Sequence, residues 1–395
     1  MSHFLQAVFW TCVAWLVYVY AGYPLCLWLI GRWRSFEPMC RADYLPKVSV
    51  LISARNEEKD IGWKVSETLD WKYPVGQLEV IVASDASEDR TDEILRGFHD
   101  SRLKYVRMSS RVGKNEALNH ISRLASGDVL FFSDANSHIG ADCLQKMTSY
   151  FADLRVGCVT GVEKTLQDGK DQAVTLGSEN YLEYELFISR LESKLGSVLV
   201  CDGSIFCIRR ELFVPLESNF ANDLELPLHI GNGGYAVLCD PSARSLEKAT
   251  QSPREEFLRR RRICAQGALG FWKLRRSIGG LRRWQFLSHK LFRWLVPIPL
   301  AALLLSSAWL STRPFFLFCF LLQLAAYVLA LMGMILESRL RRAHGLLIMP
   351  YYYMLLHVAA IVGVIQGIFG KRFVTWDVAA HSRGQETQTV GAERI

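Results

Sequence analysis

Acidic and amide side chains gather at three points of the sequence, each directly after a run of apolar residues. Asn56, Glu57 and Glu58 follow the first run, Asp85 to Asp89 follow the second, and Asp134 to Asn136 follow a later one. Any one of these groups could simply cap the helix that comes next. All three together, with Gly113-Lys114 alongside, favour a site for a nucleotide and a metal ion.

The elements that must position these side chains alternate along the chain. Strand–helix alternation with nearly continuous apolar strands predicts an α/β domain built on a parallel sheet, covered on both faces. Ligands bind beyond the carboxyl ends of the strands in such sheets, and the three polar groups lie at those ends. We expect strands at 47–53, 78–84, 103–108, 128–134 and 157–162, and helices at 58–70, 89–100, 113–126 and 141–153.

Long apolar runs flank this polar region. The chain has 395 residues, of which 50% are hydrophobic and 22% charged. Runs without Asp, Glu, Lys or Arg occupy 4–30, 294–311, 315–336 and 346–369, near or above the roughly 18–20 residues that cross a bilayer as a helix. This pattern excludes disorder and a freely soluble enzyme. We expect a transmembrane anchor at 1–34, a polar domain at 46–275, an amphipathic interface segment at 276–293, three transmembrane segments within 294–370 and a tail at 371–395.

The charges are unevenly distributed as well. Residues 254–293 hold ten Arg, two Lys and two Glu, a net charge of +10, whereas the whole chain carries +7. A basic, aromatic-rich stretch beside a membrane suits anionic lipids and phosphorylated ligands. Nucleic acid would use the same charge, but the adjoining transmembrane segments argue against it. Arg32 and Arg34 after the first apolar run place the polar domain in the cytoplasm, on a multi-pass protein of the cytoplasmic (inner) membrane.

Several motifs in order along the chain resemble those of a known family. Together they are similar to the inverting, membrane-associated glycosyltransferases of family 2, and most of all to the cellulose-synthase-like bacterial enzymes of exopolysaccharide synthesis. The first four motifs are Ser53–Glu58 (SARNEE), Asp85–Thr91 (DASEDRT), Gly113–Asn119 (GKNEALN) and Asp134–Asn136 (DAN). The later ones are Cys201–Arg210, Asn222–Leu226, Gly234–Val237 with Ala243 and Glu247, and Arg259–Ile263, where processive members carry Q-x-x-R-W.

The resemblance implies a GT-A fold, which is a Rossmann-like nucleotide-diphospho-sugar transferase domain, together with transmembrane helices. It also implies a nucleotide-sugar donor and a divalent cation, Mg²⁺ or Mn²⁺. Asn136 replaces the second acid of the D-x-D motif, and an amide oxygen is a weaker ligand than a carboxylate. His138 is expected to be a surface residue rather than a further ligand. The donor-binding residues implied are Asn56, Glu57, Asp85, Lys114 and Asp134, with Asp134 and Asn136 at the metal.

Asp223 is the candidate general base, because inverting displacement needs a carboxylate within reach of the acceptor hydroxyl. It could also cap the following helix. Asn222 stands where the family has a second acid, which should lower the pKa of Asp223 relative to a paired acid. Arg259 and Arg262 can bind a diphosphate or a lipid phosphate. Ile263 stands in place of the motif's Trp, which favours the addition of one sugar, or a few, over polymerisation.

The sequence thus predicts a membrane-bound inverting glycosyltransferase with a lipid-linked or polysaccharide acceptor, acting in cell-surface or exopolysaccharide synthesis. Its expected partners are the donor, the acceptor, membrane lipids and other subunits of polysaccharide synthesis. One alternative is a polyprenyl-phosphate glycosyltransferase, which hands a sugar directly to a lipid phosphate. Another is a catalytically degenerate subunit of an export complex, motivated by Asn136, Asn222 and Ile263.

Overall fold

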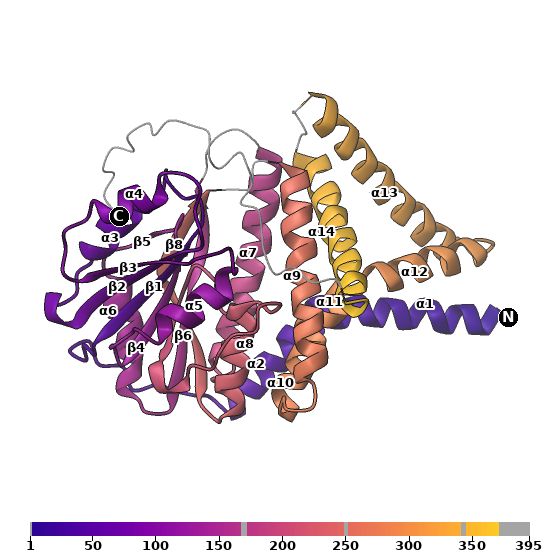
Figure 1. The fold of residues 1–395 in the computed structure, drawn as a ribbon. Helices are drawn as coiled ribbons and strands as arrows, with labels where there is room; N and C mark the ends of the chain where they lie inside the picture. The colour runs from indigo at the N-terminus through magenta and orange to yellow at the C-terminus, as the bar shows by residue number, and fades with distance from the viewer. Residues whose placement is uncertain (1, 167–171, 249–251, 341–344, 371–395) are drawn as a thin grey trace.

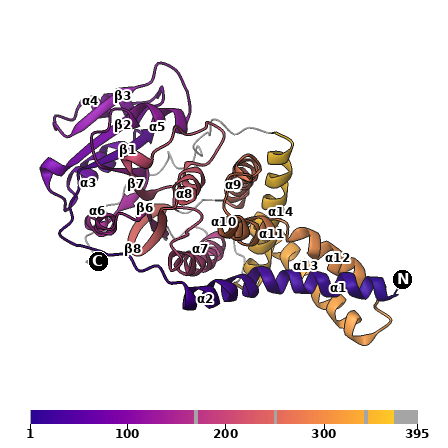
Figure 2. The same ribbon diagram turned by 90° about the horizontal axis from the view of Figure 1, so that it is seen from below.

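The computed structural model describes residues 2–166, 172–248, 252–340 and 345–370. A sheet with its covering helices forms one side of the molecule, and long helices form the other (Figure 1). Figure 2 shows the same division from below, with α1, α12 and α13 extending away from the sheet. The tail predicted at 371–395 lies outside the described residues.

Four parallel strands form the part of the sheet that the sequence predicted most closely. They lie in the order β3-β2-β1-β4, with Val48 of β1 beside Leu78 of β2 and Val129 of β4. Their carboxyl ends therefore meet at one edge, as expected. The strands are β1 (Val48–Ala54), β2 (Leu78–Ser84), β3 (Leu103–Arg107) and β4 (Val129–Asp134).

The rest of the sheet is mixed, which corrects the prediction of a wholly parallel sheet. β7 (Ile205–Arg209) runs antiparallel to β4 on one side and to β6 (Val156–Leu166) on the other. β8 (Ala236–Lys248) then pairs parallel with β6 and antiparallel with the short β5 (His138–Ile139). The chain enters β7 from the opposite end of the sheet, and local sequence patterns carry no information on that direction.

Side chains of the strands point alternately to the two faces, and each face has its own core. Val50 and Ile52 of β1 belong to one apolar cluster and Leu51 to the other. Both faces are thus covered, as the nearly continuous apolar strands predicted. The helices over this part are α3 (Ile61–Leu69), α4 (Thr91–Arg96), α5 (Lys114–Ser122) and α6 (Cys143–Ser149).

The remaining helices link the sheet to the apolar end of the molecule. The N-terminal helix consists of α1 (Ser2–Val17), a π-helical turn (Tyr18–Gly22) and α2 (Tyr23–Trp33). The others are α7 (Gln172–Ser193), α8 (Asn222–Asn232), α9 (Pro253–Leu274), α10 (Gly280–Gln285), a π-helical segment (Phe286–Leu291), α11 (Phe292–Trp294), α12 (Pro297–Trp309), α13 (Pro314–Leu340) and α14 (Gly345–Ile368).

Within the described part of the chain, three helices are long and apolar enough to cross a membrane: Ser2–Trp33, Pro314–Glu337 and Leu347–Ile368. A fourth span forms only if Gly280–Trp294 and Pro297–Trp309, which are bent by 56°, count as one. α12 has 13 residues, fewer than the roughly 20 that a straight span requires. The segment predicted at 294–311 is therefore interrupted near its start, where Pro297 and Pro299 interrupt the helical hydrogen bonding.

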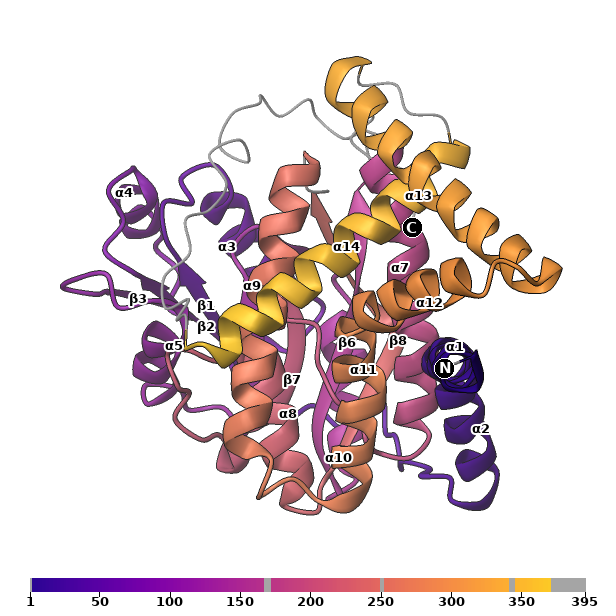
Figure 3. The same ribbon diagram turned by 90° about the vertical axis from the view of Figure 1, so that its right-hand side faces the viewer.

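α14 lies directly on α9 (Figure 3). Two glycines of α14 allow this approach, because a Cβ at Gly363 would collide with the carbonyl oxygen of Arg261, and one at Gly367 would collide with that of Ala265. The helix that carries the arginine run is thus packed against a candidate membrane span.

Candidate active site

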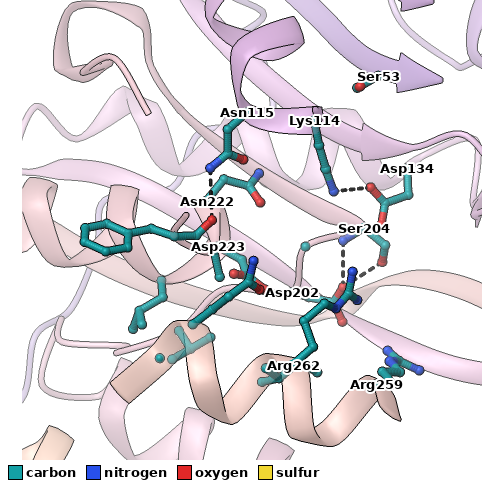
Figure 4. Close-up of a pocket in the computed structure, with 18 of the residues that line it drawn as sticks. Ser53, Lys114, Asn115, Asp134, Asp202, Ser204, Asn222, Asp223, Arg259 and Arg262 are labelled. Atoms are coloured by element: carbon teal, nitrogen blue, oxygen red, sulfur yellow. Dashed lines mark hydrogen bonds and ion pairs between the residues drawn. The ribbon is translucent and has the colours of Figure 1, made fainter. Parts of the chain in front are cut away.

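A pocket lies between the carboxyl ends of the parallel strands and α9, and most of the predicted site residues line it (Figure 4). They come from β1, β2, α5, β4, α8 and α9, elements far apart in the sequence. Asn56 and Asn136 are the predicted site residues that do not line it. Those that do are Glu57, Asp85, Lys114, Asp134, Asp223, Arg259 and Arg262.

Asp85 holds the loop that presents Lys114. Its Oδ1 accepts a hydrogen bond from the Val112 amide at 2.7 Å, and its Oδ2 accepts one from the Gly113 amide at 2.9 Å. Gly113 has a φ of 92°, a conformation that only glycine adopts readily. The sequence G-K therefore places the lysine at the first position of α5, facing the pocket.

Asn56 lies behind the pocket and fixes the loop after β2. Its side-chain Oδ1 accepts a hydrogen bond from the Glu88 backbone amide at 2.8 Å, and its backbone amide donates to Ser87 Oγ at 3.1 Å. Arg55 lines the pocket and was missed by the sequence reasoning; its Nη1 donates to the carbonyls of Asp85 and Ala86. Asn56 thus shapes the donor side of the pocket through the loop after β2.

Asp134, at the end of β4, faces Lys114. The lysine Nζ lies 2.5 Å from Asp134 Oδ1, and the two side chains are 18% and 25% exposed (Figure 4). Asn136 is exposed and does not line the pocket. His138 stacks on Trp63 at 3.6 Å between ring centroids, away from the pocket lining. Of the D-x-N motif, only the first residue therefore faces the site.

Asp223 lies in the first turn of α8, and Ala221 occupies the N-cap position. The alternative interpretation of Asp223 as a helix cap is therefore wrong. A Cβ at Gly203 would lie 3.3 Å from Asp223 Oδ2, so the glycine keeps this side of the carboxylate open. Burial raises the pKa of Asp223; Lys114 opposes the shift and Asp134 adds to it. The neighbouring Asn222 is buried, and its Nδ2 has no hydrogen-bond partner in the described part of the chain.

Three further carboxylates line the pocket that the sequence reasoning gave no role: Glu163 of β6, Asp202 and Glu247 of β8. Burial, followed by the charge of Glu163, raises the pKa of Asp202 to about 7. The pKa of Glu247 is also raised, first by burial and then by Glu163 and Asp134. Only the pairing of β6 with β8 brings these groups together, although Glu247 was visible as the last residue of a family motif.

α9 supplies positive charge opposite these acids. Arg259 Nη2 lies 3.1 Å from Glu163 Oε2, and this ion pair raises the pKa of Arg259. Burial, followed by the charge of Arg259, lowers the pKa of Arg262 to about 10, whereas Asp223 and Asp134 act in the opposite direction. Both predicted arginines therefore face carboxylates of the site.

Aromatic side chains line the pocket, although Ile263 stands where the family motif has a tryptophan. Phe286 and Trp294 reach it from the segments after α9. Trp294 sits against Gly267, where a Cβ would lie 2.5 Å from its ring. An aromatic wall is therefore present, supplied by residues that the motif comparison did not consider.

The fit of the pocket to a divalent cation depends on its carboxylates. Within residues 2–166, 172–248, 252–340 and 345–370, no three His, Cys, Asp or Glu side chains are arranged to hold a metal ion by themselves. Asp134 already pairs with a cationic group, and mutual repulsion with Glu163 and Asp134 helps to raise the pKa of Glu247. The site therefore suits a cation that Asp134 holds together with oxygen atoms of a ligand.

Comparison with known proteins identifies relatives of the sheet domain. Residues 49–215 match the model of a family described as "Glycosyl transferase family 2". A beta-monoglucosyldiacylglycerol synthase of Trichormus variabilis is 26% identical over 268 residues, which are 64% of this chain and 57% of that protein. An N-acetylglucosaminyltransferase of Rhizobium meliloti is 28% identical over 218 residues, 50% of either chain. The chain thus spans less than two thirds of these relatives.

One solved structure is similar over nearly the whole chain. It is a mannosyltransferase from Pyrobaculum calidifontis, in complex with GDP-Man and Mn²⁺. The TM-score is 0.71 at 22% sequence identity, and the match covers 93% of this chain and 100% of that one. At this identity the likeness establishes a common fold.

Proposed function

We propose that the chain is a membrane-bound inverting glycosyltransferase of family 2, because residues 49–215 match the model of that family and the chain has the GT-A fold. It moves a sugar from a nucleotide-diphosphate donor to a lipid-linked or glycan acceptor, in the synthesis of cell-surface or exopolysaccharide. It adds one sugar, or a few, rather than polymerising. The relative named as a beta-monoglucosyldiacylglycerol synthase supports a lipid acceptor, and the relative named as an N-acetylglucosaminyltransferase supports transfer of a sugar.

One observation carries this proposal: the donor residues and the candidate base line one pocket. Asp85, Lys114 and Asp134 lie at the strand ends, and Asp223 lies on α8 across from them. In an inverting displacement the acceptor oxygen attacks the anomeric carbon as its bond to the diphosphate breaks. Asp223 takes the proton of the acceptor hydroxyl. Lys114 and Arg262 stabilise the negative charge that grows on the leaving diphosphate.

Charge balance favours a divalent cation in this reaction. The pocket lining holds seven acidic side chains beside seven basic ones, and a diphosphate that enters adds negative charge near Asp134. Asp134 and the diphosphate would hold Mg²⁺ or Mn²⁺, which would supply Lewis-acid stabilisation of the leaving group. The residues of this chain provide the base, the cationic side chains and the fixed loop after β2.

The proposed membrane location places the active site beside its acceptor. We place the domain at 46–275 on the cytoplasmic side of the cytoplasmic membrane. The segment at 276–293 lies at the interface, and the anchor at 1–34 and the apolar helices within 294–370 lie in the bilayer. The candidate spans and the basic, aromatic-rich α9 to α11 support this arrangement. The proposed partners are the donor, the acceptor, membrane lipids and other subunits of polysaccharide synthesis, without nucleic acid.

The decisive test is a donor-panel assay on membranes that contain the full-length chain. We expect release of nucleoside diphosphate from one donor, abolished by EDTA and restored by Mg²⁺ or Mn²⁺. Chromatography of the lipid products, with undecaprenyl phosphate as sole added acceptor, distinguishes direct transfer to the lipid phosphate. Nucleotide binding without turnover of any donor would contradict the proposal and favour a degenerate subunit.

A further inference from the structure

A group of buried charges lies at the end of the pocket that faces the apolar helices. Glu185 of α7 contacts three basic groups of the segment after α10. Lys290 Nζ lies 2.9 Å and His289 Nε2 lies 3.1 Å from Glu185 Oε2, and Arg293 pairs with Glu185 Oε1. Lys290 also lines the pocket. The Glu185 carboxylate therefore contacts three basic side chains.

His289 lies between two carboxylates. Its Nδ1 lies 2.9 Å from Glu192 Oε1, and its Nε2 faces Glu185, so both ring nitrogens meet carboxylate oxygens. Glu192 Oε1 accepts a further hydrogen bond from the Tyr23 hydroxyl, and Glu192 Oε2 accepts one from the Leu199 amide. Glu192 is thus fully engaged with the protein.

The charge of Arg260 joins this group through Tyr181, which lies between two guanidinium groups. The Cζ of Arg260 lies 4.2 Å and that of Arg293 5.3 Å from the centroid of the Tyr181 ring. Arg260 pairs with Glu256 at 3.4 Å, and both Arg260 and Tyr181 line the pocket. Three acidic side chains, Glu185, Glu192 and Glu256, thus lie among three cationic ones, Lys290, Arg293 and Arg260, with His289 between Glu185 and Glu192.

Two guanidinium nitrogens of the group lack partners. Nε of Arg260 and Nη1 of Arg293 are buried and make no hydrogen bond to any residue that the structure describes. Arg293 is only 9% exposed. A buried charged donor without a partner is costly unless a ligand or water meets it. The unpaired donor of Arg260, which lines the pocket together with Lys290, calls for an anion.

Beside these charges the pocket wall is apolar and continuous with a candidate membrane span. Ile263, Phe286 and Trp294 line it. Trp294 also packs against the cluster that contains Ala360 and Val364 of α14. A ligand at this end would therefore meet cationic side chains and an apolar wall together, which matches a phosphate attached to a hydrocarbon chain.

We propose that this end of the pocket binds the phosphate group of a lipid, with Lys290 and Arg260 as its contacts, so that the acceptor is an anionic lipid. The inference rests on the proposed function and deepens it, because it separates phosphate-bearing lipids from neutral lipids. The acceptor approaches along the apolar wall, and its phosphate stops at the basic group. Its reactive end then lies in the same pocket as Asp223.

The first test compares lipids that differ only in the phosphate. The affinities of the full-length chain are measured by calorimetric titration in neutral detergent. Citronellyl phosphate is compared with citronellol, and dihexanoyl phosphatidate is compared with dihexanoylglycerol. We expect the preferred phosphate to bind about tenfold more tightly than its alcohol, the effect of one charge-assisted contact. The two pairs distinguish an isoprenoid from a glycerolipid source. Equal affinities within both pairs, or inorganic phosphate binding as tightly as either lipid phosphate, would overturn the inference.

Two variants on different helical segments locate the site. Lys290→Gln and Arg260→Gln should each weaken binding of the preferred lipid phosphate about tenfold, and Lys290→Arg should restore it. Lys273→Gln is the matched control, because Lys273 is an α9 cation that pairs with Glu217 outside the pocket. If Lys290→Gln fails to fold, Arg260→Gln decides. Unchanged affinity in the folded variants would place the phosphate elsewhere.

The same preparations separate failure of this inference from failure of the proposed function. UDP and GDP with Mn²⁺ are titrated in parallel. Nucleotide binding without any preference for lipid phosphate would sink the inference and leave the glycosyltransferase proposal standing. Absence of nucleotide binding and of donor turnover would sink the proposed function. Retained preference for lipid phosphate in that case would still confirm the phosphate site.

Discussion

Burial sets the protonation of Asp223 more strongly than its neighbour in the sequence does. The sequence showed only that Asn222 removes a like charge from beside it. In the fold, desolvation raises the pKa of Asp223, and the charge of Asp134 raises it further. Asp223 therefore becomes an active base at higher pH than an exposed aspartate, whose pKa is about 3.9.

Replacement of the base is the most direct prediction at the residue scale. Asp223→Asn should lower the rate of transfer by about 100-fold to 10,000-fold, the contribution of a positioned general base. Nucleotide binding, measured by titration with UDP and GDP, should be retained. Glu225→Gln is the matched control, since Glu225 lies in the same helix outside the pocket lining. Turnover of Asp223→Asn at the rate of the control would assign the base to another residue.

A second prediction uses the pH profile. Asn222→Asp restores a like charge beside Asp223, which favours the protonated form of the base. Since the base must be ionised, activity is lost as the pH falls through its pKa. The acid limb of kcat/KM should therefore move to higher pH in Asn222→Asp than in the unchanged chain. An acid limb that stays in place would show that another group controls this limb.

At the scale of elements, the contact between α14 and α9 controls the position of the arginines. Gly363→Ala should push the two helices apart, because its Cβ would collide with the backbone of α9, at a cost of about 1–3 kcal/mol. Transfer should fall with it, because α9 carries Arg262. Gly280→Ala is the control, since nothing lies within 4 Å of a Cβ at that position. Unfolding by SDS titration and the transfer assay measure both effects, and equal behaviour of the two variants would contradict the packing argument.

The sequence predicted the elements that depend on local pattern. β1 to β4 begin and end within one residue of their predicted bounds, because continuous apolar runs between turns specify them. The antiparallel direction of β7 and the pairing of β6 with β8 depend on contacts between distant segments. For the same reason Asp85, Lys114 and Asp134 were found from strand ends, whereas Glu163 and Asp202 emerged only from the fold.

At the scale of the whole molecule, a buried side-chain hydrogen bond helps to join the N-terminal helix to the sheet domain. The Tyr23 hydroxyl donates to Glu192 of α7 at 2.5 Å, and the two residues are 0% and 1% exposed. Tyr23→Phe leaves a buried carboxylate oxygen short of a donor, so stability should fall by about 1–3 kcal/mol. Tyr150→Phe is the comparison, because the Tyr150 hydroxyl makes no hydrogen bond to the described residues. Equal SDS midpoints for both variants would show that this hydrogen bond does not stabilise the junction.

The packing of α14 on α9 through Gly363 and Gly367 sets the distance between the pocket and the candidate membrane span. Arg259 and Arg262, which line the pocket, lie on a helix that packs directly against a candidate membrane span. In the proposed membrane location, the reacting centre is then held at one height above the bilayer surface. On this proposal, transfer depends on the distance between the acceptor hydroxyl and the membrane surface, so acceptors are selected by length as well as by chemistry.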